Sequence, residues 1–494
     1  MKSPHTLMVQ GTTSDAGKSV LVTALCRVLA RHDVRVVPFK PQNMALNSAV
    51  SCEGLEIGRA QAVQAQACFL EPSVKMNPVL LKPNSNAGSQ VIVHGKAIGN
   101  MDARAYQEFK PQLLKEVVNV HEVLKDEFEV VIVEGAGSPA EINLRANDIA
   151  NMGFAEAVDC SVIIVADIDR GGVFAHLYGT WSLLSDSEKL RVKGFVINRF
   201  RGDASLLESA ISWLYNTTKV PVIAVIPYIL NLHIEAEDSV ALQNYQTNLS
   251  STSALKVTVI HFPHISNFTD FDPLRQHPQV DCLFSKDVDS MQGSDLIILP
   301  GSKNVRSDLA WLNQNTWFEV IQRHLRLGGK IMGICGGYQM LGNIIHDPDG
   351  VEGEVGSSRG LSLIDMETVL TAQKDLKQVE GVVAVNAKDK VVPVEAYEIH
   401  SGRSLGPSLN NPVFLINGQN EGAWADNRNI LGTYLHGLFD LPETLSYLLN
   451  WAGLTYQDKF DYPAFREQEI NRLADAVEET FPYKKLCSLI NLPQ

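Results

Sequence analysis

The chain has 494 residues, of which 45% are hydrophobic and 20% are charged, and its formal net charge is −14. This length predicts two or more domains, and this composition is ordinary for a soluble globular enzyme. The acidic balance argues against a general binder of nucleic acid or of membrane surfaces, although a local basic pocket could still accept an acidic substrate.

The cysteines are odd in number and scattered along the chain, and none forms a Cys-x-x-Cys pair. This number and spacing of cysteines argues against a disulfide framework and against a structural zinc site, and it favours a reducing compartment. The first residues pass directly into a short strand pattern, and no apolar stretch reaches membrane-spanning length. We therefore expect a cytoplasmic protein.

The first half of the sequence alternates short apolar runs with helical patterns. A helix is predicted from about Lys18 to His32. The predicted strands are Thr6–Val9, Val34–Phe39, Val130–Val133, Ser161–Ala166, Gly194–Asn198 and Val222–Ile226. Continuous apolar strands separated by helices are typical of a parallel sheet that is covered on both faces. The sequence therefore predicts an α/β domain over residues 1–235.

A glycine-rich loop, Gln10-Gly-Thr-Thr-Ser-Asp-Ala-Gly-Lys-Ser19, follows the first strand. The N–H groups of such a loop can cradle phosphate oxygens, the lysine adds a cation for the β- and γ-phosphates, and the serine hydroxyl can reach Mg²⁺. The spacing is one residue longer than the common form, and a glycine turn with a chance Gly-Lys-Ser is the alternative. The nucleotide-binding residues predicted in this loop are Thr12, Thr13, Asp15, Ala16, Gly17, Lys18 and Ser19.

Polar residues follow three further strands of this domain. Glu134 ends one strand beside the loop, where a carboxylate can hold Mg²⁺ directly or through water. Asn198 ends another, and its amide could read adenine, although asparagine is equally common in a turn. A third strand ends in a segment that is richer in charged residues than a turn requires, with Asp167, Asp169 and Arg170. They could contact metal, phosphate or substrate carboxylates.

The long loop, together with residues 38–48 and 133–137, resembles the dethiobiotin-synthetase-like group of ATP-dependent carboxylate-activating enzymes. In that group a lysine on the second strand contacts phosphate or substrate, and this position falls on Lys40. A second acidic metal ligand lies between that strand and the position of Glu134. The resemblance therefore makes Glu56 the candidate for the second metal ligand.

The composition shifts after this domain. Residues 236–256 are polar and without strong periodicity, which predicts a linker. A new α/β pattern begins with Val257–Phe262, and further strands are predicted at Asp295–Leu299 and Lys330–Ile334. We expect a second α/β domain over residues 257–445 and a helical C-terminal extension over residues 446–494.

Cys335 stands in Gly333-Ile-Cys-Gly-Gly337, where the last of these strands gives way to a predicted helix. Such a turn presents one side chain beside free backbone N–H groups, which is what a nucleophile attacking a carbonyl requires. His436, in a short apolar strand that ends at Gly437, is the candidate base. Either residue alone would more often be structural, but the two together favour catalysis.

This segment resembles the Gly-x-Cys-x-Gly elbow of class I glutamine amidotransferases. The resemblance implies that Cys335 attacks the side-chain amide of glutamine and that His436 protonates the departing ammonia. It also implies that N–H groups at Gly336 and near Gly301 hold the oxyanion. Most such domains place a glutamate two residues after the histidine, where this chain has Leu438. The branch found in cobyric and cobyrinic acid amidotransferases, where a Cys/His pair suffices, shares this departure, which leaves open what orients the histidine.

A phosphate loop followed by this elbow in one chain resembles the CobB/CobQ-type amidotransferase family over nearly the whole length, and within it the cobyric acid synthases. The distinguishing segments are residues 40–48, 167–174 and 198–203. The resemblance implies amidation of a corrinoid polycarboxylate, adenosylcobyrinic acid a,c-diamide, at its b, d, e and g carboxylates. ATP and Mg²⁺ would activate each carboxylate as an acyl phosphate, and glutamine would supply the ammonia. The product would be adenosylcobyric acid, in cobalamin biosynthesis. The same resemblance places His400 near the glutamine pocket.

Three alternatives remain open. The related cobyrinic acid a,c-diamide synthases carry a different sequence after the second strand. An amidoligase for another acid, such as a cell-wall lipid precursor, usually divides the two activities between separate chains. A switch ATPase of the ParA/MinD type carries a signature lysine early in the loop, where this chain has Thr12 and Thr13. Nothing in the sequence indicates the oligomeric state.

Overall fold

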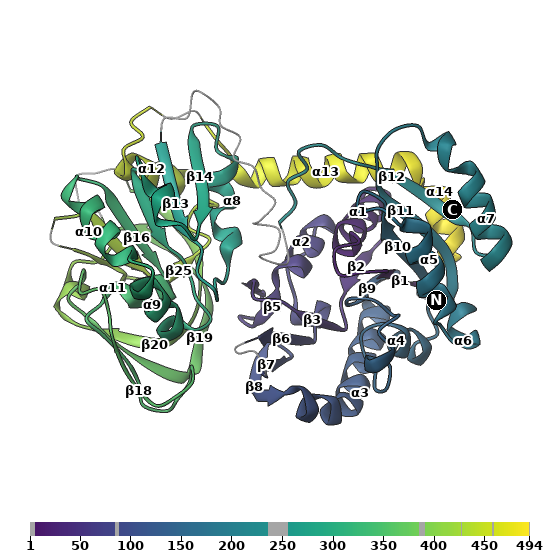
Figure 1. Ribbon diagram of the computed structural model, residues 1–494, viewed down its shortest axis with the longest axis horizontal. Coiled ribbons are helices and arrows are strands. Elements are labelled where there is room, and N and C mark those ends of the chain that lie inside the picture. The colour runs from purple at the N-terminus through teal and green to yellow at the C-terminus, as the bar shows by residue number, and fades with distance from the viewer. Residues whose placement is uncertain are drawn as a thin grey trace. The chain divides into compact units, whose positions relative to one another are not determined.

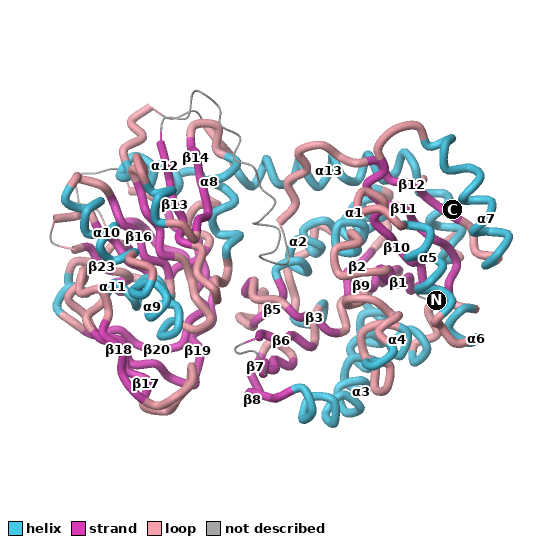
Figure 2. The backbone as a smooth tube through the Cα atoms, in the orientation of Figure 1, coloured by secondary structure: helices cyan, strands magenta, loops and turns pink. Residues whose placement is uncertain are grey.

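The computed structural model describes residues 5–83, 88–235, 255–384, 391–425, 427–456 and 459–493. Contacts divide the chain into two compact units. The first comprises Met1–Ala45, Ser51–Glu235 and Arg466–Gln494, and the second comprises Leu46–Val50 and Ala236–Phe465. Both units combine helices with sheets (Figures 1 and 2).

The first unit is built on a six-stranded sheet with the order β12-β11-β10-β1-β9-β2. Each neighbouring pair of strands is parallel. The strands are β1 (His5–Gly11), β2 (Val36–Phe39), β9 (Val130–Glu134), β10 (Ser161–Asp167), β11 (Val192–Phe200) and β12 (Val222–Pro227). Their runs of buried β-branched residues suit a sheet covered on both faces. The parallel α/β fold predicted from the sequence is confirmed.

Helices cover this sheet, and a smaller, separate sheet belongs to the same unit. The helices are α1 (Lys18–Arg31), α2 (Arg59–Ala67), α3 (Ala103–Glu127), α4 (Met152–Ala157), α5 (Val173–Ser182), α6 (Asp186–Lys189) and α7 (Glu208–Thr218). The smaller sheet has the order β3-β6-β7-β8. Its strands are β3 (Gln42–Met44), β6 (Val79–Pro83), β7 (Gly88–Val93) and β8 (Lys96–Asp102), and the short strand β5 (Glu56–Gly58) precedes α2.

The end of the chain returns to the first unit. From Arg466 onward, α13 (Tyr462–Thr480) and α14 (Tyr483–Ile490) supply apolar side chains to the same buried cluster as β1 and α1. The guanidinium of Arg27 in α1 is fully buried, pairs with Glu467 and donates to Oδ1 of Asn471 at 3.0 Å. The expected C-terminal extension is therefore helical, and its last part completes the core of the first unit.

The second unit holds a six-stranded sheet with the order β14-β13-β15-β16-β24-β23. It is parallel except for the pairing of β23 with β24. Its strands are β13 (Leu255–Ile260), β14 (Val280–Ser285), β15 (Leu296–Leu299), β16 (Lys330–Ile334), β23 (Ala423–Trp424) and β24 (Ile430–Thr433). This sheet matches the second α/β pattern of the sequence. Residues 236–254 of the expected linker lie outside the described residues.

A second, largely antiparallel sheet and five helices complete this unit. The sheet strands are β17 (Ile344–Asp347), β18 (Gly356–Arg359), β19 (Glu367–Val383), β20 (Pro393–Leu405), β21 (Phe414–Ile416), β22 (Gln419–Glu421) and β25 (Leu435–His436). The helices are α8 (Asp272–Gln276), α9 (Val305–Gln314), α10 (Trp317–Arg326), α11 (Gly336–Leu341) and α12 (Pro442–Ala452). Segment Leu46–Val50, which contains β4 (Ser48–Val50), also belongs here.

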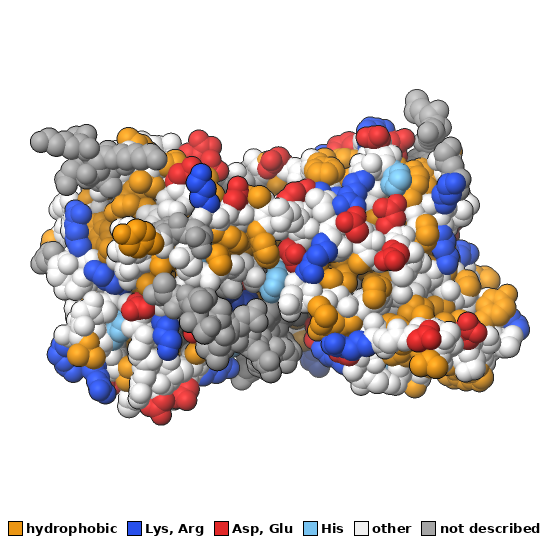
Figure 3. Space-filling model, turned by 90° about the horizontal axis from the view of Figure 1, so that it is seen from above, with side chains coloured by type: hydrophobic (Ala, Val, Ile, Leu, Met, Phe, Trp, Pro, Cys, Tyr) orange, Lys and Arg blue, Asp and Glu red, His pale blue; other side chains and the backbone are white. Residues whose placement is uncertain are grey.

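Within the described ranges, each helix is too short or too polar to span a bilayer. On the face that Figure 3 presents, acidic and basic side chains are interspersed.

Candidate active sites

The glycine-rich loop of the first unit wraps around Lys18. Gly17 precedes α1 with φ +96°, a conformation that side-chain-bearing residues rarely adopt. A Cβ there would lie 2.0 Å from Nδ2 of Asn198. Nζ of Lys18 donates to the carbonyl oxygens of Thr13, Ser14 and Gly137 at 2.9, 3.0 and 2.9 Å. The lysine ammonium is thus held at the centre of the loop.

A buried cluster beside the loop is centred on Glu134. Its Oε1 accepts from Oγ of Ser19 at 2.7 Å and from Nζ of Lys40 at 2.8 Å, and its Oε2 accepts from Nε2 of Gln64 at 2.5 Å. Burial by itself raises the pKa of Glu134, but the charge of Lys40 and these hydrogen bonds outweigh it and hold the pKa below its usual value. The structure therefore brings together three residues that the sequence had predicted separately. It adds Gln64 of α2, which the sequence analysis missed and for which the sequence carries no motif.

Several buried polar atoms at this site make no hydrogen bond within the described residues. They are Oε1 of Gln10, Oγ1 of Thr12, Oε1 of Gln64 and Oδ1 of Asn151. A Cβ on Gly135 would lie 2.4 Å from Oδ1 of Asn151 and 3.2 Å from Cγ of Gln10, so these side chains are neighbours. Because buried polar groups normally find partners, these atoms fit a polar ligand such as a nucleotide with its Mg²⁺.

A metal ion at this site would depend on few protein ligands. Within the described residues, no group of three or more His, Cys, Asp or Glu side chains is arranged to hold a metal. Ser19 and Glu134 are the pair that fits Mg²⁺ bound mainly by phosphate and water oxygens. Glu56, the other predicted ligand, is buried and forms an ion pair with Lys82. Its role as a metal ligand stays a prediction.

The remaining predicted residues of this unit lie at the carboxyl edge of β10 and β11. Nδ2 of Asn198 donates to the carbonyl oxygen of Ala16 at 3.1 Å, so this side chain binds the backbone of the loop. Asp15 pairs with Arg170 at 2.7 Å. The two predicted carboxylates have arginine partners that the sequence analysis missed: Asp167 pairs with Arg199 at 2.7 Å, and Asp169 pairs with Arg201 at 2.8 Å.

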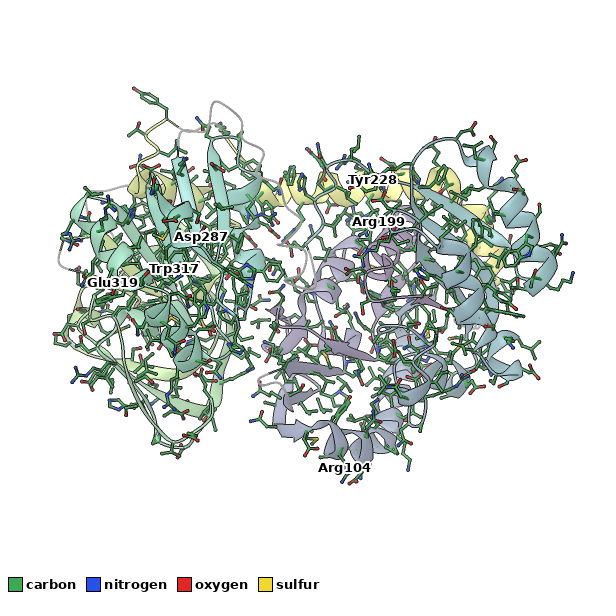
Figure 4. The ribbon with its side chains drawn as sticks, viewed as in Figure 1. Arg104, Arg199, Tyr228, Asp287, Trp317 and Glu319 are labelled. Carbon is green, nitrogen blue, oxygen red and sulfur yellow. The ribbon has the colours of Figure 1, made fainter. Side chains whose placement is uncertain are left out.

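This charged edge continues onto β12. The guanidinium of Arg201 lies 3.3 Å from the ring centroid of Tyr228, which follows β12. β11 and β12 are neighbouring parallel strands, and Figure 4 labels Arg199 and Tyr228 at their ends. The edge therefore offers an aromatic ring, arginines and carboxylates beside the phosphate loop. Whether these groups contact nucleotide or acid substrate stays a prediction.

In the second unit, Cys335 occupies a strained turn between β16 and α11. Its φ is +51° and its ψ is −109°, an uncommon conformation for a residue with a side chain and one found where a nucleophile is presented. A Cβ on Gly337 would lie 1.9 Å from the carbonyl oxygen of Leu299, so this glycine permits the close approach of α11 to β15. Sγ of Cys335 lies 3.6 Å from the carbonyl oxygen of Ile399.

The predicted oxyanion residues lie beside this turn. A Cβ on Gly336 would lie 2.9 Å from the backbone nitrogen of Ser302. A Cβ on Gly301 would lie 3.4 Å from Cε1 of His436. The loop after β15 therefore contacts both the elbow and the histidine. The structure brings all four predicted residues of this site into one place, while the roles of the glycine N–H groups stay predictions.

The structure also answers what orients His436. Nδ1 of its ring lies 2.5 Å from Oδ2 of Asp270, in the short 3₁₀ turn η5 (Phe268–Phe271). Both side chains are almost fully buried, and the Nε2 atom of the ring has no hydrogen-bond partner in the described part of the chain. Burial lowers the pKa of the imidazolium, but Asp270 and Cys335 outweigh it and raise the pKa to about 10. Asp270, from a distant segment, thus gives His436 a carboxylate partner, although position 438 holds a leucine.

Tyr397 of β20 contacts this pair, and His400 lies three positions further along the same strand. The ring of Tyr397 stacks on His436 at 5.3 Å between centroids, and its hydroxyl donates to Oδ1 of Asp270 at 3.2 Å. His400 stacks on Tyr434 at 3.8 Å. The Tyr434 hydroxyl lies 3.3 Å from Nε2 of Gln339 in α11, the helix that follows the elbow. His400 therefore lies in the polar surroundings of that helix, and its predicted place near bound glutamine remains to be tested.

Comparison with known proteins supports this division of the chain. Residues 7–240 match the family described as the CobQ/CobB/MinD/ParA nucleotide binding domain, and residues 256–444 match the CobB/CobQ-like glutamine amidotransferase domain. The similar solved structures include PurLQS from Thermotoga maritima, which is 16% identical, with 44% of this chain and 97% of that chain covered and a TM-score of 0.31.

Two further similar structures have lower scores. A glutamine amidotransferase from Thermotoga maritima is 13% identical, with 48% of this chain and 98% of that chain covered and a TM-score of 0.27. Chloroplast FtsY from Physcomitrella patens is 17% identical, with 45% and 58% covered and a TM-score of 0.26. This protein thus joins a nucleotide-binding domain of the CobQ/CobB/MinD/ParA type to a CobB/CobQ-like glutamine amidotransferase domain.

Proposed function

We propose that the protein is a cytoplasmic, glutamine-hydrolysing amidoligase of the cobyric acid synthase type. In this proposal it uses ATP, Mg²⁺ and glutamine to amidate the b, d, e and g carboxylates of adenosylcobyrinic acid a,c-diamide. The observation that carries it is a buried Asp270–His436 pair beside the strained Cys335, in one chain with a Lys18 phosphate loop. The two family matches support glutamine-dependent amidation in general.

The glutaminase half is supported by the geometry of the second unit. The Cys335 thiolate attacks the amide carbon of glutamine, and N–H groups at Gly336 and near Gly301 stabilise the oxyanion. The C–N bond breaks as the His436 imidazolium gives its proton to the departing nitrogen, which leaves as neutral ammonia. The imidazole then removes a proton from water, which hydrolyses the thioester to glutamate and restores the thiolate–imidazolium pair. Asp270 holds the ring in the orientation that both steps need and stabilises the imidazolium that acts in the first.

The synthetase half rests on the loop and cluster of the first unit. Bound Mg-ATP would supply the phosphoryl group that turns an unreactive carboxylate into an acyl phosphate, which ammonia can attack. Lys18 and the loop N–H groups fit the phosphates, while Ser19 and Glu134 fit Mg²⁺. Lys40, Asp167, Asp169 and Arg170 are candidates for contacts to the acid or to the transferred phosphate. The corrinoid identity of the acid is supported by the likeness of residues 40–48, 167–174 and 198–203.

The proposal is tested by mass spectrometry of a complete reaction. The protein is incubated with Mg-ATP, glutamine and adenosylcobyrinic acid a,c-diamide, and four successive amidations are expected. Parallel reactions contain cobyrinic acid, to detect an a,c-diamide synthase, or unrelated polycarboxylates. Turnover on another acid, with no mass change of the diamide, would overturn the corrinoid assignment.

A further inference from the structure

The segment Leu46–Val50 belongs to the second unit, although the chain on either side of it belongs to the first. Residues 47–50 of this segment are buried. The segment comes a few positions after Lys40, which contacts Glu134 in the first unit. A short stretch of the nucleotide-binding half of the sequence is therefore built into the amidotransferase unit.

This segment makes reciprocal hydrogen bonds with the turn that carries Asp270. Oδ1 of Asn47 accepts from the backbone N–H of Phe268 at 3.2 Å, and Oδ1 of Asn267 accepts from the backbone N–H of Ser48 at 3.1 Å. Asn47 and Phe268 are both almost fully buried, at 0% and 2% exposure. The N–H groups at the start of a helical turn have no acceptor within the turn and need one from outside. Asn47 supplies that acceptor.

The residue at the ordinary capping position does not supply it. Asn267 immediately precedes η5 with φ +51°, and its side chain makes no capping hydrogen bond to that turn. A capping side chain usually belongs to the residue just before the helix. Here the cap of η5 comes instead from Asn47, far away in the sequence. The conformation of the turn that presents Asp270 therefore depends on the Leu46–Val50 segment.

A second link joins the segment to the catalytic histidine through Tyr397. The hydroxyl of Tyr397 lies 3.5 Å from the carbonyl oxygen of Ser48 and 3.2 Å from Oδ1 of Asp270, while its ring stacks on His436. Asp270 also accepts from the backbone N–H of Gly437 at 3.3 Å. The segment thus contacts both supports of the histidine, the Asp270 turn and the Tyr397 ring.

We propose that Asn47 is a positioning residue for glutamine hydrolysis, capping the turn that presents Asp270 to His436. The inference rests on the glutaminase half of the proposed function and adds a residue from the nucleotide-binding half of the sequence. If the segment shifts, the cap is lost, Asp270 moves away from His436, and glutamine hydrolysis slows.

The test measures glutaminase kcat and KM of the full-length protein between pH 6 and 10. Asn47→Ala should lower kcat about tenfold or more with little change in KM, because a misoriented imidazole impairs proton transfer rather than glutamine binding. The alkaline limb of the kcat profile should also move to lower pH. The charged and titratable groups that face His436 are Asp270 from η5, Cys335 from the elbow and Tyr397 from β20, and withdrawal of Asp270 leaves the buried imidazolium less stabilised.

Two further variants make this test specific. Gln378→Ala removes an exposed side chain whose Nε2 donates to the carbonyl oxygen of Val50 at 3.0 Å, at the other end of the same segment. It should leave kcat and the pH profile unchanged. Tyr397→Phe keeps the stacked ring but removes the hydroxyl that links Ser48 to Asp270. It should shift the pH profile in the same direction as Asn47→Ala. If Asn47→Ala does not fold, Tyr397→Phe tests the inference in its place.

The outcomes separate this inference from the proposed function. An active wild type with an unchanged Asn47→Ala variant overturns the inference alone. A lower kcat with an unshifted pH profile, after correction for active sites by thioester titration, also overturns it, because the residue would then only support folding. A wild type that hydrolyses no glutamine would overturn the proposed function and the inference together.

Discussion

Nδ1 of His436 lies 2.5 Å from Oδ2 of Asp270, a residue 166 positions earlier in the chain. This contact gives the Cys335–His436 pair a third member in a chain that has Leu438 where related domains place a glutamate. An imidazolium whose pKa is raised to about 10 keeps its proton across neutral pH. In the proposed mechanism this imidazolium protonates the departing ammonia.

Replacement of Asp270 by Asn should impair glutamine hydrolysis strongly. The amide cannot compensate for burial of the imidazolium, and we expect kcat to fall by roughly 10²–10⁴-fold. The alkaline limb of the pH profile should move to lower pH. The matched control is Asp289→Asn, which changes an exposed aspartate of the same unit and should leave both quantities unchanged. A wild-type profile in Asp270→Asn would show that this carboxylate does not serve catalysis.

Replacement of Cys335 by Ala should separate the two sources of ammonia. Synthesis from glutamine should be lost, because no thioester can form. Synthesis from a high concentration of free ammonium should remain, because the first unit is unchanged. The measurement is product formation with each nitrogen source, beside thermal unfolding to show that the variant is folded. Loss of both activities in a folded variant would contradict the division of labour between the two units.

Replacement of Lys18 by Ala should remove synthesis from both nitrogen sources. The loop would lose the ammonium group that its carbonyl oxygens hold beside the expected phosphate position. ATP binding, measured directly by calorimetry, should weaken in parallel. Synthesis from ammonium at the wild-type rate would exclude this loop as the ATP site.

The buried Lys40–Glu134 pair makes a prediction about stability. Glu134→Gln removes the buried carboxylate that the Lys40 ammonium contacts and should destabilise the first unit by about 3–5 kcal/mol. The double variant Glu134→Gln with Lys40→Met should recover most of this loss and still lack ATP-dependent synthesis. In the wild type the pKa of Glu134 is lowered on folding, so the stability that the pair contributes is present above the unfolded pKa and lost as the pH falls through the folded value. Urea unfolding between pH 3 and 7 measures this slope.

The Asp270–His436 pair predicts the opposite pH dependence. The folded pKa of His436 is raised from 6.5 to about 10, so its contribution to stability is complete below pH 6.5 and is lost as the pH rises toward 10. Wild type should therefore lose thermal stability more steeply than His436→Asn between pH 7 and 10. Equal slopes in the two proteins would mean that the folded histidine is not held in its charged form.

Local patterns predicted much of this molecule. The parallel sheet and the position of the phosphate loop follow from runs of β-branched residues and from Gly17-Lys-Ser19, which act within a few neighbours. The turn at Cys335 likewise needs only its flanking glycines. Such signals can be recognised in a single sequence because the conformation they require is set by adjacent residues.

Long-range packing explains what the sequence could not show. Asp270 stands in a segment without a recognisable motif, 166 positions before His436, and the fold of the chain at η5 brings the two side chains together. Arg27 and Glu467 carry no signal that they will meet. Helical periodicity shows that one face of a helix is apolar, but it does not show which core that face covers. It therefore could not predict that α13 and α14 return to the first unit.

The most direct test of the account follows the amide nitrogen of glutamine. Wild type and Cys335→Ala are incubated with Mg-ATP, adenosylcobyrinic acid a,c-diamide, glutamine labelled with ¹⁵N at its amide and excess unlabelled ammonium at neutral pH. The account predicts ¹⁵N in the new amides made by the wild type and only unlabelled nitrogen in those made by the variant. Unlabelled product from an active wild type would contradict it, because Cys335 would then not supply the ammonia used in the amidation.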